Sequence, residues 1–282
     1  MDSSVLEQPF RIRNSAGDAI TGDFRCVGDG TAKPIVIVCH GFTAHKDWGP
    51  FPLLGRRFAG AGFASVVFNF SHNGIGSNFR RLDEVEKFSR NTVGKELIDL
   101  RAVIDALEQG QIGGGNIDTR RIGLVGHSRG AGIAILHASS DARTRTVAGW
   151  STIGTFIRYT SHQKEVWERQ GYLPVTIRSI RTKLRYGIDM LRDLEAHREE
   201  YDLVRAVRRL NVPLLLVHGE ADVTVRPAEA QSLYEASDKS RTELVLIERA
   251  GHMFGARSGS ARLTPELESV TDLTVDRFRR NM

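Results

Sequence analysis

The chain has 282 residues, near the upper limit for a single hydrophobic core, and its 40% apolar and 26% charged residues exclude disordered, collagen-like and coiled-coil proteins. No apolar run approaches the roughly 18 residues of a membrane span, and the first residues lack the pattern of a secretory signal peptide, so we expect a cytoplasmic protein. The 39 Lys and Arg against 34 Asp and Glu give a net charge of +5, which permits an acidic partner without requiring one.

Short apolar runs alternate with longer helical patterns along most of the chain, which is typical of βαβ units and a mostly parallel sheet. Apolar residues at helical spacing from Val93 to Leu107 predict an amphipathic helix. A last helix is expected to begin after Thr264, whose hydroxyl can cap it. The glycine-rich stretch 110–116 follows a helix and precedes a strand, so it is expected to be a loop. The predicted strands are residues 20–26, 35–39, 64–70, 121–125, 147–150, 212–217 and 243–247.

The alternation stops between residues 151 and 210, where no strand-like run is found and apolar residues recur at helical spacing. One stripe contains Phe156, Tyr159, Gln163 and Val166, and another contains Ile177, Ile180, Leu184, Ile188 and Leu191. We therefore predict a helical cap at 151–210, inserted before the penultimate strand of a core made of residues 1–150 and 211–282. Beside the second stripe lie Arg178, Arg181, Arg185 and Arg192, which form either a solvated helix face or a site that recognises an acidic substrate.

The segment Gly126-His-Ser-Arg-Gly130 follows a buried apolar strand and precedes residues 131–138, which favour a helix. In the pattern G-x-S-x-G, the serine lies on a sharp strand-to-helix turn, and the two glycines relieve the crowding around it. The turn would expose the Ser128 hydroxyl at the carboxyl edge of the sheet. The dipole of the following helix would favour negative charge there. Ser128 is therefore the candidate nucleophile.

A serine nucleophile needs a base and a carboxylate that orients the base. Of the nine histidines, His252 lies in a glycine-flanked loop directly after the apolar run 244–247, and Asp222 lies in the loop after strand 212–217. Both loops leave the carboxyl ends of parallel strands, so they reach the same edge of the sheet as Ser128. The chain order Ser128, Asp222, His252 is also the order that this architecture requires. These three residues are the predicted catalytic triad.

An acyl transfer also needs backbone N–H groups around its tetrahedral oxyanion. The strand 35–39 ends in His40-Gly41-Phe42, and Gly41 would let this loop approach a substrate closely. We expect the backbone amides of Phe42 and Arg129 to form the oxyanion hole.

These motifs resemble those of the α/β-hydrolases. His40-Gly-Phe-Thr-Ala-His-Lys46, the segments 126–130 and 218–222, and Gly251-His252 look most like the cinnamoyl and feruloyl esterases and related small serine esterases. The resemblance covers roughly residues 33–152 and 211–255. It implies the α/β-hydrolase fold, a mostly parallel sheet flanked by helices, and the same triad and oxyanion hole.

The function hypothesis is a serine carboxylic-ester hydrolase that works through an acyl-enzyme on Ser128. The apolar cap residues predict a small-molecule ester with an apolar or aromatic acyl group, and we expect His127, Phe156 and Trp167 to contact this substrate. The same triad would also suit a peptidase or an acyl thioesterase. A non-catalytic binding protein of this fold is a third alternative.

Other chemistries find less support in the sequence. There is no H-E-x-x-H pattern, and Cys26 and Cys39 alone cannot build a disulfide framework or a structural zinc site, so no metal or cofactor is expected. No aromatic-basic motif indicates nucleic-acid binding. A homodimer is left open.

Overall fold

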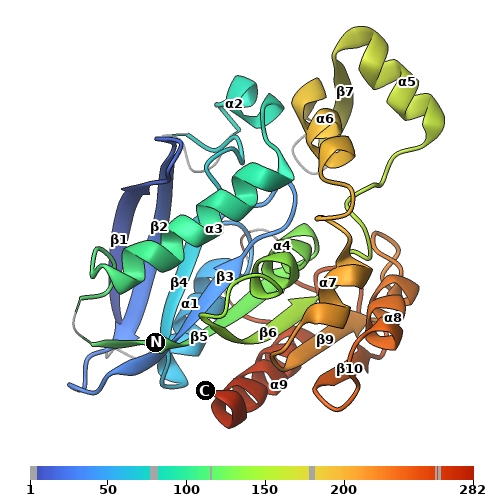
Figure 1. Cartoon of the computed structure of the whole chain (residues 1–282). Coiled ribbons are helices and arrows are strands. Elements are labelled where there is room, and N and C mark those ends of the chain that lie inside the picture. Colours follow the sequence, from blue (N-terminus) through green and yellow to red (C-terminus); the bar gives the residue numbers. More distant parts are fainter. Residues whose placement is uncertain (1–4, 77–81, 115, 178–181, 258, 260–261) are drawn as a thin grey trace.

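An eight-stranded sheet forms the centre of the molecule (Figure 1). The structure is a computed structural model, and it describes residues 5–76, 82–114, 116–177, 182–257, 259 and 262–282. The strand order is β1-β2-β4-β3-β5-β6-β9-β10, and the strands from β4 to β10 in this order are parallel to their neighbours. The strands are β1 (Val5–Arg13), β2 (Ala19–Val27), β3 (Lys33–Cys39), β4 (Ala64–Asn69), β5 (Ile117–His127), β6 (Thr144–Trp150), β9 (Leu214–Gly219) and β10 (Thr242–Ile247). This confirms the predicted α/β-hydrolase fold class.

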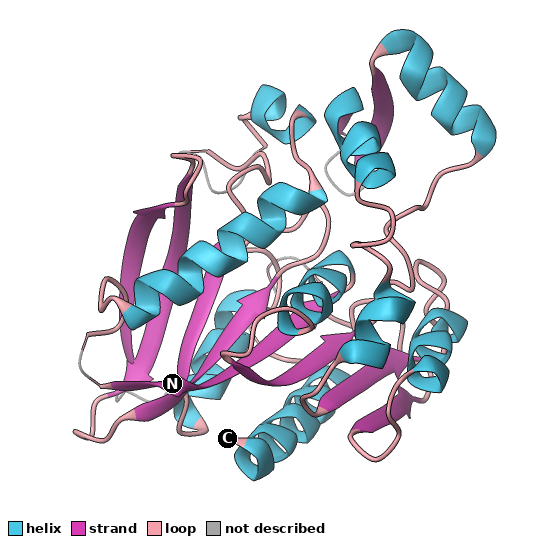
Figure 2. Ribbon diagram, in the orientation of Figure 1, coloured by secondary structure: helices cyan, strands magenta, loops and turns pink. Residues whose placement is uncertain are grey.

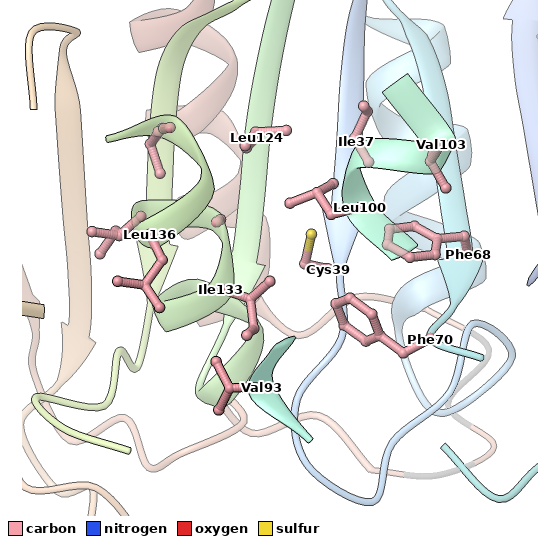
Figure 3. Close-up of a cluster of buried hydrophobic side chains, with 14 of the residues drawn as sticks. Ile37, Cys39, Phe68, Phe70, Val93, Leu100, Val103, Leu124, Ile133 and Leu136 are labelled. Atoms are coloured by element: carbon pink, nitrogen blue, oxygen red, sulfur yellow. The ribbon is translucent and has the colours of Figure 1, made fainter. Parts of the chain in front are cut away.

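Helices cover both faces of the sheet (Figure 2). The helices α1 (Phe51–Gly60) and α9 (Pro265–Asn281) pack on one face, while α3 (Val93–Glu108), α4 (Arg129–Ala138), α7 (Leu203–Arg209) and α8 (Pro227–Ala236) pack on the other; the short α2 (Val85–Ser89) precedes α3. Successive strand residues point to opposite faces, so Ile37 joins the cluster shown in Figure 3, whereas Val36 and Val38 join the cluster under α1 and α9. The inner strands of the sheet lie between these two layers of helices and are buried on both faces, which explains their continuous apolar runs.

The predicted helices of the core are present, and two of them, α3 and α9, begin at a threonine whose side chain caps the helix. Thr92 accepts a hydrogen bond from the Lys95 amide at the start of α3, at 3.1 Å. Thr264 accepts one from the Leu267 amide at the start of α9, at 3.2 Å, as the sequence predicts.

The seven predicted strands are all present, but β1 was missed. It is an edge strand that pairs antiparallel with β2, and most of its side chains are exposed. Because it buries few residues, it has no apolar run for a sequence pattern to find.

The segment between β6 and β9 differs from the expected all-helical cap. It contains α5 (Ser161–Gln170), a hairpin of β7 (Tyr172–Ile177) and β8 (Thr182–Gly187), α6 (Ile188–Ala196), and then α7, which packs against α4 and α8 (Figure 1). In β8, Leu184 and Tyr186 are buried while Lys183 and Arg185 are exposed, which is the alternation of a strand. The prediction of a helix from the second stripe is therefore wrong, because the stripe begins in the hairpin and continues into α6.

The first predicted stripe is only partly helical, since α5 begins at Ser161, after Phe156 and Tyr159. The basic stripe is not a helix face either. Arg185 is exposed in β8, with its guanidinium 4.7 Å from the centre of the Tyr172 ring, and Arg192 is exposed on α6. Ile180, Arg178 and Arg181 lie outside the described residues. Within the part of the chain that is described, no helix is long and apolar enough to cross a membrane.

Candidate active site

The turn between β5 and α4 holds Ser128 in a strained backbone conformation, with φ 55° and ψ −117°. A Cβ atom on Gly126 would lie 2.4 Å from the Gly130 carbonyl oxygen, and one on Gly130 would lie 2.3 Å from the Cys39 carbonyl oxygen. Both contacts are with backbone atoms, which cannot move aside cheaply. The turn therefore requires glycine on both sides of Ser128, for the reason that the sequence pattern indicates.

Asp222 and His252 come from the loops after β9 and β10 and meet at the carboxyl edge of the sheet. His252 Nδ1 lies 2.7 Å from Asp222 Oδ2. The other carboxylate oxygen, Oδ1, accepts hydrogen bonds from the amides of Thr224 and Val225, at 2.9 and 3.0 Å. These amides fix the carboxylate, and the carboxylate in turn orients the His252 ring.

A second histidine on Asp222 was missed by the sequence analysis. His218 Nε2 lies 2.9 Å from the Val225 carbonyl oxygen and 3.3 Å from Asp222 Oδ2. Both neighbours are acceptors, so this nitrogen carries the proton. Burial alone would raise the pKa of Asp222, but hydrogen bonds from His218 and His252 outweigh it and hold that pKa well below its usual range. The four-residue spacing from His218 to Asp222, directly after a buried strand, was the available signal.

His127, predicted as a substrate contact, holds the loop of His252. Its Nε2 donates to the His252 carbonyl oxygen at 2.9 Å, and the Ser151 hydroxyl donates to the same oxygen at 3.0 Å. Burial, together with the charge on His252, lowers the pKa of His127 to about 3. His127 is therefore a neutral donor that fixes the backbone behind the His252 ring.

The loop after β3 approaches Ser128 closely. A Cβ atom on Gly41 would lie 3.3 Å from Ser128 Cβ. His40 ties this loop to the end of β4, because its Nδ1 donates to the Gly41 carbonyl oxygen at 2.9 Å and its Nε2 accepts from the Phe70 amide at 3.3 Å. In the described part of the chain, the amides of Phe42 and Arg129 have no hydrogen-bond partner, so both are available to an oxyanion.

Ser128 and His252 open into one cavity of about 1270 Å³, which the side chain of Phe42 also borders. The predicted substrate contacts His127, Phe156 and Trp167 all line it. Further apolar and aromatic lining comes from the segment between β6 and β9, namely Ile153, Tyr159, Leu173, Val175, Tyr186, Met190 and Leu194. Ser128 and His252 therefore face a large and mostly apolar space.

A family model described as the alpha/beta hydrolase family matches residues 36–261. The match spans β3 to the loop after β10 and includes Ser128, Asp222 and His252. The chain belongs to the alpha/beta hydrolase family.

Solved structures of esterases and related hydrolases share the fold of this alpha/beta hydrolase. The esterase domain of a Rhodothermus marinus protein is 18% identical with a TM-score of 0.67, covering 98% of both chains. The ferulic acid complex of Est1E from Butyrivibrio proteoclasticus is 18% identical with a TM-score of 0.69, covering 96% of this chain and 98% of that one. A dienelactone hydrolase from Anabaena variabilis is 17% identical with a TM-score of 0.64, covering 98% and 99%. No curated protein sequence matches the hydrolase at a significant level.

The described residues of the hydrolase contain no group of three or more His, Cys, Asp and Glu side chains arranged to hold a metal ion. Cys39 is fully buried, and burial raises the pKa of its thiol far above the usual range.

Proposed function

We propose that this hydrolase is a serine carboxylic-ester hydrolase with Ser128 as nucleophile, His252 as base and Asp222 as the orienting carboxylate. The observation that carries the proposal is the hydrogen bond between His252 and Asp222, at 2.7 Å. His252 borders the same cavity as Ser128, whose backbone is strained. A serine held in this way, on the same cavity as a base with its own oriented carboxylate, is suited to nucleophilic acyl transfer.

In the proposed reaction, Ser128 Oγ attacks the ester carbonyl carbon while His252 Nε2 takes the hydroxyl proton. The amides of Phe42 and Arg129 then donate to the oxyanion of the tetrahedral intermediate. The intermediate collapses to an acyl-enzyme as the C–O bond to the alcohol breaks and His252 returns the proton to that alcohol. A water molecule, deprotonated by His252, attacks the acyl-enzyme and releases the acid and the free serine.

The apolar lining supports a small ester with an apolar or aromatic acyl group as substrate. Phe156 and Trp167 are at most 5% exposed and border the cavity. Trp167 lies 5.6 Å from the stacked ring of Tyr186 and 5.7 Å from the Tyr159 ring, measured between ring centres. Such a wall favours burial of apolar surface. The resemblance to the cinnamoyl and feruloyl esterases belongs with this part of the proposal.

A substrate panel tests the reaction class. We expect hydrolysis of 4-nitrophenyl acetyl, butyryl, octanoyl and cinnamoyl esters, with the larger acyl groups preferred, and little turnover of an aminoacyl arylamide or an acyl-CoA. Trp167→Ala should change the ratio of kcat/KM between large and small acyl groups by roughly 10- to 200-fold, because it removes apolar contacts. Preferential cleavage of the arylamide or the acyl-CoA would instead identify a peptidase or a thioesterase. Binding without turnover of any of these compounds would indicate a non-catalytic protein.

The pH profile tests whether the reaction depends on the neutral form of a single base. His127 and His40 are already neutral at pH 5, because burial lowers their pKa values to about 3 and about 4. Asp222 stays ionised, since its pKa is held below the usual range. We therefore expect kcat/KM to rise with pH in a single step, with or without EDTA, because the base must be neutral to accept the Ser128 proton. A flat profile, or loss of activity with EDTA that zinc restores, would contradict this mechanism.

A further inference from the structure

The side chain of Arg129 reaches the cavity, although the sequence pattern assigned only its backbone amide to the site. Arg129 follows Ser128, is 9% exposed and borders the cavity. Its Nε donates to both carboxylate oxygens of Glu96 on α3, at 3.0 and 2.8 Å. Glu96 also accepts from the side-chain amide of Asn91, at 2.8 Å. A buried carboxylate on the core side therefore holds the guanidinium in one orientation.

The opposite edge of this guanidinium, between Nη1 and Nη2, has little to bind within the protein. Nη2 lies 3.9 Å from the Met190 sulfur on α6. For Nη1, the described residues provide no hydrogen-bond partner. The guanidinium carbon lies 5.4 Å from the centre of the Phe156 ring, which lines the same cavity. The Nη1–Nη2 edge is one that can pair with a carboxylate through two parallel hydrogen bonds. Among the described residues, this oriented fork meets only the weak sulfur acceptor of Met190.

Two polar side chains of the cavity wall also lack a hydrogen-bond partner among the described residues. Trp167 Nε1 and Tyr186 Oη are buried without a hydrogen-bond partner, and both residues border the cavity. The charged Asp and Arg residues among its described lining are Asp47, Arg129, Arg158 and Arg257. Asp47 already accepts from Lys46, at 2.9 Å. Arg158 is likewise ion-paired, with Glu229, so each of these two lining residues has a partner of opposite charge within the protein.

We propose that Arg129 binds a carboxylate of the substrate, so that the enzyme prefers esters whose apolar acyl chain ends in a free carboxylate, as in half-esters of dicarboxylic acids. This inference rests on the proposed function. A bound carboxylate would touch the guanidinium directly while Glu96 lies behind it, so attraction to the nearer charge exceeds repulsion from the farther one. The neighbouring Asp193 carboxylate accepts from the Gly94 amide and the Tyr201 hydroxyl, at 3.2 and 3.1 Å, and so has donors of its own.

The first measurement compares half-esters with matched neutral esters. 4-Nitrophenyl hemisuccinate, hemiglutarate and hemiadipate are each assayed beside the same compound with its carboxylate methylated. At the best chain length we expect kcat/KM to favour the free carboxylate by about 10- to 100-fold, as for a hydrogen bond to a charged group. Using this ratio removes any loss of rate that both substrates share. Equal rates for the two members of every pair would overturn the proposal.

Variants of the ion pair separate recognition from a purely structural role. Arg129→Gln should bring the ratio of kcat/KM between the half-ester and its methylated counterpart to about one. Because that variant leaves Glu96 buried without its cation, the Arg129→Gln/Glu96→Gln double variant is measured as well and should give the same result. Glu96→Gln alone should raise the ratio, because it leaves the charge of Arg129 uncompensated. A merely structural pair predicts that Arg129→Gln and Glu96→Gln both lower stability and leave the ratio unchanged, which would overturn the proposal.

A binding assay that needs no turnover distinguishes this inference from the proposed function. Calorimetry should show that the Ser128→Ala variant binds glutarate, and that it binds the neutral glutaramide at least about tenfold more weakly. This difference in affinity should disappear in the triple variant Ser128→Ala/Arg129→Gln/Glu96→Gln. If no ester is hydrolysed but glutarate binding depends on Arg129, the esterase proposal fails and the carboxylate site stands. If esters are hydrolysed but glutarate binds equally well without Arg129, the carboxylate site fails and the esterase stands.

Discussion

Ser128→Ala should abolish ester hydrolysis, with a loss of turnover of order 10⁶, the size expected when a triad loses its nucleophile. The oxyanion donors and the Asp222–His252 pair would remain, but no atom would be left to form the acyl-enzyme. Alanine has nearly the volume of serine, so the melting temperature should change little. The assay follows 4-nitrophenol release, and mass spectrometry of the trapped acyl-enzyme should show the acyl group on the wild-type protein only.

Ser140→Ala is a matched control, because Ser140 follows the other end of α4 and donates only to the Leu136 and His137 carbonyl oxygens. It should keep full activity. Near-normal turnover in Ser128→Ala, purified free of host esterases, would refute Ser128 as the nucleophile.

Asp222→Asn should lower turnover by about 10⁴-fold, as expected when the carboxylate of a triad becomes an amide. Both oxygens of Asp222 face donors, namely His252 Nδ1, His218 Nε2 and the amides of Thr224 and Val225. An asparagine must point its NH₂ group at one of these donors, whichever way it is turned. The substitution therefore either forces His252 into the wrong tautomer or breaks the loop that holds it.

The control for this variant is Asp238→Asn. Asp238 is exposed, and its carboxylate accepts from Ser240 and lies 3.3 Å from Arg241 Nε, both in the same surface turn. Its turnover should equal that of the wild type. A kcat/KM for Asp222→Asn within a few-fold of the wild type would show that another group orients the base.

The sequence was sufficient for seven of the eight strands of the sheet and for placing the candidate triad at strand ends, because both depend on local signals. Buried parallel strands are continuous apolar runs, and each candidate follows the carboxyl end of such a run. The turn at Ser128 is specified just as locally, since the atoms that exclude a side chain from Gly126 lie within residues 130 and 131. Signals of this kind survive without knowledge of the tertiary structure.

The features that the sequence did not predict depend on how segments pack in three dimensions. In the hairpin β7–β8, the sequence pattern indicated a helix where the residues form strands, because a short apolar run fits both the helical and the strand period. The edge strand β1 buries too little to leave a pattern. The Glu96–Arg129 ion pair and the Met190 contact unite three elements that are far apart in sequence. No spacing rule predicts that an arginine beside the nucleophile turns its side chain into the cavity.

The position of the insertion in the sheet has a consequence for how such enzymes diverge. The chain leaves the core at the end of β6 and returns through α7 to β9, and these two strands are parallel neighbours, with Val147 opposite Leu214. The hairpin and the helices α5 and α6 thus form an excursion between adjacent strands that contributes no strand to the eight-stranded sheet. A lineage could lengthen, shorten or exchange this excursion by recombination without changing the register of any core strand. Such a change would alter the part of the cavity wall that holds Trp167 and Tyr186, while the strands that lead to Ser128 and Asp222 keep their places.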